Sequence, residues 1–338
     1  MLCLLEYEKC PLFGLKSKKT LCYILGIRDK KLLKQSYTSK LVEPYIDKSG
    51  KPRLIEPPRT ELKLIQKRIK NMLGKIDVPD NVFSGIKGRS YTDNAKLHLG
   101  AKPRFLFKVD LTAFFPSISR NKVYAFFRDD LCCSPDIADI LCNFTTIDLS
   151  KATLRDAPLI YGFLTEKKVS CYNHLISGAP TSQILSYLVN HKMFDEMQAL
   201  ANKHTVTMTI YVDDITFSSE QIISKRFQES VFHIIKQHDY RLSEAKVKSY
   251  SKQYPKLVTG VIIDSNGKLA IKNSLQWKIS SEHTYLRNHP DDIKRRQRLR
   301  GLVTAARQVK KNAFPTIHQF AFETTYQDCV EMKNSKYN

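Results

Sequence analysis

The sequence predicts an α+β fold, an antiparallel sheet backed by helices, and three observations lead to this prediction. Residues 205–218 alternate apolar and polar side chains with the period of two that is typical of a half-buried strand. Residues 104–110 form a second apolar-rich strand. Residues 181–200 and 223–239 repeat apolar side chains at helical spacing, so helices accompany the strands in a layered domain.

Two adjacent aspartates, Asp213 and Asp214, interrupt the alternating stretch. The first run ends at Val212, and a second alternating run, from Ile215 to Ser218, follows the aspartates. This pattern predicts a β-hairpin that carries two carboxylates at its tip. A simple turn without chemistry is the alternative, because aspartate favours turns.

A third aspartate, Asp110, closes the strand at 104–110. Beside the hairpin, Asp110 would gather with Asp213 and Asp214 enough negative charge to hold two Mg²⁺ ions about 4 Å apart. Such ions activate the attacking oxygen and stabilise the leaving oxygen in phosphoryl transfer. Carboxylates this concentrated repel one another without metal, which disfavours a purely structural role.

The composition indicates a large core and a polyanionic partner. The chain has 338 residues, of which 42% are hydrophobic, enough for two or three subdomains. Lysine and arginine number 55 against 33 acidic residues, a formal net charge of +22. Nucleic acid is the simplest partner for so large an excess. A basic surface that only keeps the protein soluble is the alternative.

Several other classes of protein are excluded by the spacing of the cysteines, the shortness of the apolar runs and the absence of the usual glycine-rich phosphate-binding motifs. None of the eight cysteines lies in a CxxC pair, so the sequence predicts no zinc site. The cysteines are expected to be packing residues of a protein in a reducing compartment. No run approaches the roughly 20 apolar residues of a membrane span, which predicts a cytoplasmic protein without membrane association. The sequence contains no GxGxxG or Walker pattern.

The remaining segments are assigned from apolar spacing and turn residues. They are a basic helical stretch at 1–38, a hairpin at 44–58, a helix at 59–73, a glycine-punctuated loop at 83–98, helix near 121–142, a poorly patterned connection around 145–172, and one strand with a glycine break at 257–264. Beyond Lys268 the chain is strongly basic, with KRRQRLR at 294–300, which predicts a small helical segment on nucleic-acid backbone.

Three motifs, in this order, resemble those of a reverse transcriptase: VDLTAFFPSI at 109–118, GAPTS at 178–182 and YVDD at 211–214. The resemblance implies a right-hand polymerase architecture with fingers, an antiparallel-sheet palm and a helical thumb. In those terms the expected parts are a basic N-terminal segment at 1–38, fingers at 39–100 and 120–172, a catalytic palm at 101–119 and 173–267, and a thumb at 268–338.

The resemblance also implies roles at the catalytic centre. Asp110 and Asp213 are expected to be ligands of two Mg²⁺ ions, with Asp214 assisting and the backbone carbonyl at Leu111 completing the shell. A protonated Lys246 would donate to the leaving pyrophosphate. The family's NxxK segment lacks its asparagine here, and a plain surface lysine is the alternative.

A second set of residues is implied for the incoming deoxynucleoside triphosphate. Arg53 matches the arginine that lies over the triphosphate, with a plain surface arginine as the alternative. Phe115 matches the aromatic that blocks a nucleotide 2′-hydroxyl, while Phe114 should point into the core. The floor of the pocket is expected at Gly178, Ala179 and Pro180. Ser177 and Gln183 depart from the glutamine and proline common in the family, which affects fine specificity and not the activity.

Two further marks are similar to those of bacterial retron reverse transcriptases: Asn94-Ala95-xx-His98 before the Asp110 strand, and Val258-Thr259-Gly260 after the hairpin. Taken alone, His98 would be a loop or core histidine, and VTG a strand with a bulge. The residues assigned to RNA binding are Asn94, His98, Val258, Thr259 and Gly260 and, in the thumb, Arg295, Arg296, Arg298 and Arg300.

Retron enzymes use their own structured non-coding RNA as template and start the DNA at a guanosine 2′-hydroxyl. The product is branched multicopy single-stranded DNA (msDNA), and such units act in anti-phage defence with an effector protein. These partners are implied by the resemblance, whereas the residues alone indicate a metal-dependent polymerase that binds nucleic acid. Two other interpretations stay open: an intron-like reverse transcriptase, and a catalytically idle RNA-binding scaffold that restrains an effector.

Overall fold

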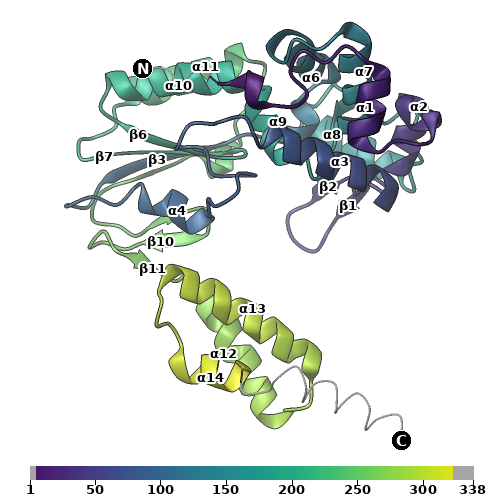
Figure 1. The fold of residues 1–338 in the computed structure, drawn as a ribbon. Helices are drawn as coiled ribbons and strands as arrows, with labels where there is room; N and C mark the ends of the chain where they lie inside the picture. Colours follow the sequence, from purple (N-terminus) through teal and green to yellow (C-terminus); the bar gives the residue numbers. More distant parts are fainter. Residues whose placement is uncertain (1–4, 323–338) are drawn as a thin grey trace, which may run out of the picture. The chain divides into compact units, whose positions relative to one another are not determined.

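The computed structural model describes residues 5–322 and divides the chain into two compact units (Figure 1). Unit 1 comprises the chain up to Arg89 together with Phe107–Ser249, and unit 2 comprises Ser90–Leu106 together with the chain from Tyr250 onward. The outer ends of the expected N-terminal segment and thumb, 1–4 and 323–338, lie outside the described residues. No helix within 5–322 combines the length and the apolar character needed to cross a bilayer.

A four-stranded sheet carries the aspartates, with its strands in the order β6-β7-β3-β8. The strands are β3 (Phe105–Asp110), β6 (Thr207–Tyr211), β7 (Asp214–Ser219) and β8 (Lys248–Tyr250). β6 and β7 form an antiparallel hairpin in which Tyr211 pairs with Asp214. The predicted strand at 104–110 and the predicted hairpin at 205–218 are therefore confirmed, and they are neighbours in the sheet.

Two helices, α10 (His191–Lys203) and α11 (Lys225–Gln237), cover one face of this sheet (Figure 1). Between the layers, the rings of Phe107 and Phe217 stack with their centroids 5.7 Å apart. Phe217 also meets Phe227 of α11 edge-on at 5.3 Å. Aromatic side chains bury large apolar areas and so dominate the energetics of such a layer. The residues therefore form an antiparallel sheet backed by helices, as predicted.

The helix predicted at 181–200 is wrong in one respect, because it is broken into α9 (Ser182–Leu188) and α10. At the break, Asn190 donates its Nδ2–H to the Ser186 carbonyl at 2.8 Å, and Tyr240 donates its hydroxyl to Asn190 Oδ1 at 2.7 Å. A side chain that bonds to nearby backbone competes with continuation of the helix. The partner, Tyr240, is distant in sequence, so local spacing could not reveal the break.

The other elements of unit 1 are mostly short. They are η1 (Tyr7–Lys9), α1 (Lys18–Leu25), η2 (Lys30–Leu33), α2 (Gln35–Thr38), η3 (Ser39–Leu41), β1 (Tyr45–Asp47), β2 (Arg53–Ile55), α3 (Thr60–Leu73), α5 (Phe114–Ser117), α6 (Arg120–Ala125), η4 (Phe126–Asp130), α7 (Pro135–Thr145), β4 (Thr146–Asp148), α8 (Ala157–Glu166), β5 (Asn173–Leu175) and η5 (Glu244–Lys246). The predicted hairpin at 44–58 and helix at 59–73 are confirmed. The poorly patterned connection contains β4 and α8, and the N-terminal stretch is only partly helical.

Unit 2 contains a small sheet of β9 (Lys256–Val258), β10 (Val261–Ile263) and β11 (Leu269–Ala270) with α4 (Tyr91–Lys96) against it. The prediction of one strand at 257–264 is wrong, because Val258 pairs with Val261 across a turn. Thr259 and Gly260 have φ angles of 44° and 90°, and positive φ at both residues is typical of the tight turns that hairpins favour. The predicted loop at 83–98 is also wrong over α4, which Ser90 and Asp93 start with a capping box.

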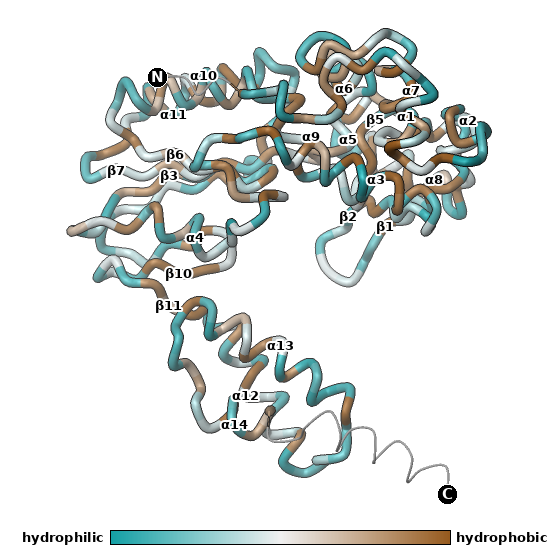
Figure 2. Tube along the Cα trace, viewed as in Figure 1, coloured by the Kyte–Doolittle hydropathy of each residue, from teal (hydrophilic) through white to brown (hydrophobic). Residues whose placement is uncertain are grey.

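The basic C-terminal segment is helical, as predicted, and consists of α12 (Asn273–Asn288), α13 (Ile293–Val309) and α14 (Pro315–Phe322). α13 is largely hydrophilic and is interrupted by apolar positions (Figure 2). Those positions build a small core, which includes Leu299 and Val303 of α13 and Ile279 and Leu286 of α12. The compact units place 90–106 with this segment, whereas 90–100 was expected in the fingers and 101–106 in the palm, and the boundaries of fingers, palm and thumb remain predictions.

Candidate active site

Asp110 lies at the end of β3, and its side chain is only 10% exposed. Its backbone carbonyl accepts a hydrogen bond from the Ser243 N–H at 2.8 Å. The next residue, Leu111, donates its N–H to the Asp213 carbonyl at 3.0 Å. These two bonds hold the end of β3 against the β6–β7 turn and against the segment that leads to Lys246. Aspartates that are a hundred residues apart in sequence are thereby brought together.

Lys246 meets Asp110 directly, with Nζ donating to Oδ1 at 2.6 Å. The lysine is the last residue of a single turn of 3₁₀ helix, η5, and its side chain is 45% exposed. The ammonium group is thus free on its solvent side while it balances the charge of a buried carboxylate. The structure thus places Lys246 beside Asp110, and its role in the reaction stays a prediction.

Asp213 occupies the turn between β6 and β7, next to Val212. Val212 has a φ angle of 59°, a conformation that is strained for a β-branched residue and that clusters at functional sites. Burial, and after it the negative charge of Asp110, raises the pKa of Asp213 to about 6. The two carboxylates therefore lie close enough to repel each other.

Asp214 begins β7 and forms an ion pair with Lys108, a residue that sequence reasoning missed. The two side chains are 15% and 14% exposed. Burial raises the pKa of Asp214, and Lys108 partly opposes this effect. The available signal was the position of Lys108 two residues before Asp110, since alternate residues of a strand share one face of the sheet.

Within residues 5–322, no three His, Cys, Asp or Glu side chains gather closely enough to hold one metal ion. Asp214 is turned to Lys108, yet the negative charge of Asp110 adds to burial in raising the pKa of both Asp213 and Asp214, so the three expected aspartates lie near one another. Asp110 and Asp213 nonetheless suit a divalent cation: oxygen ligands are what Mg²⁺ prefers, and a cation would relieve the repulsion that raises the pKa of Asp213.

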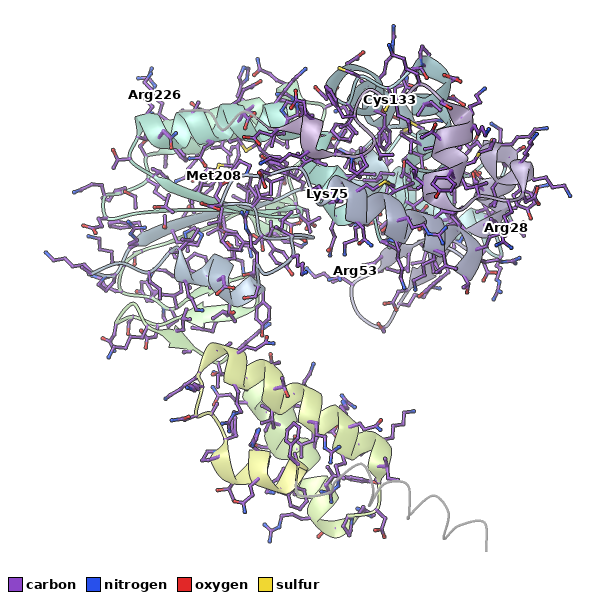
Figure 3. All side chains as sticks on the ribbon, in the orientation of Figure 1. Arg28, Arg53, Lys75, Cys133, Met208 and Arg226 are labelled. Carbon is purple, nitrogen blue, oxygen red and sulfur yellow. The ribbon has the colours of Figure 1, made fainter. Side chains whose placement is uncertain are left out.

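The residues expected at the nucleotide come from three elements of unit 1. Arg53 lies exposed on β2 (Figure 3). Phe115 is half-buried on α5, and Phe114 is buried against Tyr240, with ring centroids 5.3 Å apart, so the core position predicted for Phe114 is correct. Gly178 has a φ angle of 108°, which favours glycine. It leads directly into Ala179 and Pro180, ahead of α9.

The residues of the Asn94–His98 mark are buried in unit 2, which corrects the expectation that their side chains contact RNA directly. Asn94 is fully buried and donates Nδ2–H to Thr259 Oγ1 at 3.3 Å, while Thr259 donates its hydroxyl to the Tyr91 carbonyl at 3.0 Å. His98 is 2% exposed, and burial lowers its pKa to about 3, with help from Arg104. Val258 is buried as well, which leaves the Thr259–Gly260 turn as the accessible part.

The four thumb arginines expected to bind RNA have partners within unit 2, and their contact with RNA stays a prediction. Arg295 lies over the Tyr285 ring at 3.8 Å, and Arg298 Nη1 lies 3.1 Å from Glu282 Oε1. Arg296 and Arg300 hold α14 by donating to the carbonyls of its last residues, at 2.9 Å and 2.7 Å respectively. Arg298 remains more than half exposed and keeps one side open to solvent.

Comparison with known proteins gives one family. Residues 45–263 match the family described as reverse transcriptase (RNA-dependent DNA polymerase). The chain is 29% identical over 239 residues to the retron Se72 reverse transcriptase of Salmonella heidelberg, which covers 67% of this chain and 55% of that protein. It is 28% identical over 224 residues to the retron Ec86 reverse transcriptase of Escherichia coli, covering 64% and 61%. The chain thus spans between half and two thirds of the length of these two relatives.

A third relative matches over a longer region. The chain is 25% identical over 289 residues to the retron Ec73 reverse transcriptase of Escherichia coli, covering 82% of this chain and 85% of that protein. This match extends past the segment that matches the family. The similarity is therefore to retron-type proteins in particular, and it is not confined to the three short motifs.

Proposed function

The chain belongs to the reverse transcriptase (RNA-dependent DNA polymerase) family, and from this premise we propose that it is an RNA-directed DNA polymerase of the retron type. The observation that carries the proposal is the pair of carboxylates, Asp110 and Asp213, tied together by the bond from Leu111. Its substrates are deoxynucleoside triphosphates and a primer on an RNA template. Each cycle forms a phosphodiester bond and releases pyrophosphate.

Asp110, Asp213 and the Leu111 carbonyl are the groups that would hold the metal, with Asp214 assisting once it leaves Lys108. When bound, two Mg²⁺ ions supply Lewis-acid chemistry: they lower the pKa of the priming hydroxyl and offset the charge of the leaving group. Because the metal ions would lower the pKa of the priming hydroxyl, the protein needs no general base to deprotonate it. Lys246 carries a proton at Nζ beside Asp110, from where it can donate to the leaving pyrophosphate.

The nucleotide is bound by residues outside the carboxylate pair. Arg53 pairs with the triphosphate, because a guanidinium makes bidentate bonds to phosphate oxygens. Gly178, Ala179 and Pro180 form the floor under the base and the template. Phe115 packs against the sugar and excludes a 2′-hydroxyl.

The retron role adds a structured non-coding RNA, a guanosine 2′-hydroxyl as primer, branched msDNA as product, and an effector protein as partner in anti-phage defence in the cytoplasm. Similarity to retron enzymes supports this part of the proposal. In unit 2, Asn94 and His98 would act by holding the shape of the exposed Thr259–Gly260 turn, which then meets riboses and unpaired bases.

The polymerase proposal is tested by Asp110→Asn and Asp213→Asn, with the exposed Glu220→Gln as a control that makes the same change of charge. Each aspartate variant should lose several kcal/mol of transition-state stabilisation and so all measurable Mg²⁺-dependent extension, while still folding and binding RNA. Extension on an annealed RNA template is the measurement. Near-normal extension by a folded Asp213→Asn protein would remove the site assignment.

The retron proposal needs a separate test. Nucleic acid that co-purifies with the protein from its native locus is treated with RNase and then with a debranching enzyme, and what remains is sequenced. One specific RNA joined to DNA through a 2′-linkage is expected. Only linear DNA started from free 3′ ends would favour an intron-like enzyme, and no DNA at all would favour the RNA-binding scaffold.

A further inference from the structure

Glu56 and His174 form an ion pair inside unit 1 that the reaction described above does not use. Both side chains are completely buried, and His174 Nε2 lies 2.9 Å from Glu56 Oε1. The other ring nitrogen, Nδ1, lies 3.0 Å from the Cys171 carbonyl. The Cys171 carbonyl can only accept, so Nδ1 carries a proton, and with Glu56 as a carboxylate Nε2 also donates, which makes the ring an imidazolium. Burial alone would lower the pKa of His174, but the charge and hydrogen bond of Glu56 outweigh it and raise the pKa.

Glu56 also joins two backbone segments. Its second oxygen, Oε2, accepts the Ser177 N–H at 2.6 Å, and its own N–H donates to the Ser177 carbonyl at 2.7 Å. Ser177 adds a third bond, from its hydroxyl to the Leu54 carbonyl at 2.9 Å. The end of β2, which carries Arg53, is thereby fixed to the residue that precedes Gly178.

His174 reaches a third segment through β5. Its neighbour Leu175 donates its N–H to the Ile118 carbonyl at 2.9 Å, and Ser119 forms a bridge with His174 itself. Ile118 directly follows α5, the turn of helix that carries Phe115. The ion pair therefore lies where the three segments of the proposed nucleotide site meet: the Arg53 hairpin, the Phe115 helix and the Gly178 loop.

A purely structural role would be met more simply by apolar side chains. Burying two charges is unfavourable unless they are paired and fully hydrogen-bonded, and a well-packed apolar pair of similar volume is often as stable. What the charged pair adds is direction, because each hydrogen bond fixes an angle as well as a distance. Four directed bonds join Glu56 to Ser177, Ser177 to Leu54 and Glu56 to His174.

We propose that Glu56 and His174 are a positioning pair that sets the separation of Arg53 from the Gly178–Pro180 loop and so determines the affinity for the incoming nucleotide. The inference rests on the proposed polymerase function and deepens it. Neither side chain touches the nucleotide, because both are fully enclosed. A displacement of about 1 Å between binding elements is enough to cost up to about a hundredfold in rate or affinity.

The test uses two substitutions of one residue. In His174→Gln the amide nitrogen stands near the place of Nε2 and still donates to Glu56. In His174→Asn the shorter amide stands near the place of Nδ1, keeps the Cys171 carbonyl and cannot reach Glu56. Single-turnover extension of a primer annealed to RNA gives the dissociation constant of the deoxynucleoside triphosphate and the maximal incorporation rate separately.

We expect His174→Asn to weaken nucleotide binding about tenfold and to slow incorporation less than about threefold, and His174→Gln to bind within about threefold of the parent. Glu56→Gln should also bind nearly as the parent, because its amide can donate to a neutral His174 and accept from Ser177. Gln66→Leu is the control: it removes another buried hydrogen bond of unit 1, to the Phe144 carbonyl at 2.9 Å, and should leave nucleotide affinity unchanged.

The outcomes separate the two claims. If the parent protein extends no primer, the polymerase function fails and the positioning role fails with it. If the parent is active and His174→Asn binds nucleotide as the parent does, the positioning role alone is overturned. Should His174→Asn fail to fold, Glu56→Met decides, since it removes the side-chain bonds to His174 and to the Ser177 N–H and keeps the backbone bond to Ser177: a weaker nucleotide affinity supports the role, and an unchanged one overturns it.

Discussion

The ammonium group of Lys246 lies 2.6 Å from the Asp110 carboxylate. A second lysine, Lys108, pairs with Asp214. Two of the three aspartates are thus balanced by lysines, while burial and the charge of Asp110 raise the pKa of Asp213 to about 6. A cation bound beside Asp213 would relieve its repulsion from Asp110.

The two lysines should differ in what they do. Lys246→Met should slow incorporation by about 10²-fold or more without changing nucleotide affinity, because the leaving pyrophosphate loses its proton donor. The exposed Lys248→Met, two residues away, should change neither quantity. Single-turnover rates compare the three proteins, and equal rates for Lys246→Met and the parent would make Lys246 a surface lysine.

Lys108→Met should act mainly on stability. It leaves Asp214 enclosed without its ion-pair partner, and removal of one member of a buried pair typically costs about 3–5 kcal/mol. Urea unfolding measures the loss. The double variant with Asp214→Asn should recover much of it, and failure to recover would mean that the pair is not coupled.

Phe115→Ala should admit ribonucleotides, because the smaller side chain leaves room for a 2′-hydroxyl. Incorporation of each ribonucleotide and of its deoxy counterpart gives the discrimination ratio, which should fall by at least about tenfold. Phe114→Ala is the matched control: it lies in the core against Tyr240, so it should lower stability by about 3–5 kcal/mol and keep the ratio. Unchanged discrimination in Phe115→Ala would place the sugar contact elsewhere.

The basic residues of α13 should separate into two kinds. Lys294→Gln and Arg298→Gln, at exposed positions of α13, should weaken RNA binding and reduce its salt dependence by roughly one unit of slope for each phosphate that is no longer neutralised. Arg296→Gln should instead lower the stability of the helices, since Arg296 holds α14 through the Phe320 carbonyl. Salt titrations and thermal melts of the three variants distinguish these effects, and an unchanged salt slope in the first two would mean that this face binds no phosphate.

The buried, neutral His98 should make the folded protein less stable toward unfolding in acid. Its pKa falls from 6.5 to about 3 on folding, so between these values the unfolded chain binds a proton that the folded chain does not. The stability contributed by neutral His98 is complete above about pH 6.5 and decreases as the pH falls, by about 1.4 kcal/mol per pH unit. Urea unfolding of the parent and of His98→Gln over this range measures the difference. Parallel pH profiles would contradict it.

Local sequence patterns predict the parts of the fold that depend on residues close together in the sequence. The alternation before Asp213 and the run before Asp110 gave the right strands because one face of each is buried. The break at Asn190 was not predictable, since its partner Tyr240 comes fifty residues later. The hairpin at Thr259 was read as one strand because a two-residue turn hardly interrupts an alternating pattern.

In the candidate site, too, motifs predict some residues, whereas contacts between distant residues are not visible in the sequence. The aspartates, Lys246 and the core position of Phe114 follow from motifs, and the structure brings the first two together. Charge alone could not predict that Arg296 and Arg300 hold α14, because an arginine donates as readily to a helix carbonyl as to a phosphate. Lys108 was missed for the opposite reason: an interior ion pair leaves no trace in sequence beyond the face of the strand on which it lies.

Unit 2 joins Ser90–Leu106 to the chain from Tyr250 onward, with all of Phe107–Ser249 between them in sequence. On the ribosome, α4 leaves the exit tunnel long before β9 and β10, against which Ala95 is packed in the finished protein. At the usual 5–20 residues per second the delay is on the order of ten seconds, far longer than a helix needs to form. Nascent chains that stop after Ser249 can complete most of the sheet with its aspartates, yet they leave 90–106 without a core, and limited proteolysis of stalled chains should cut there first.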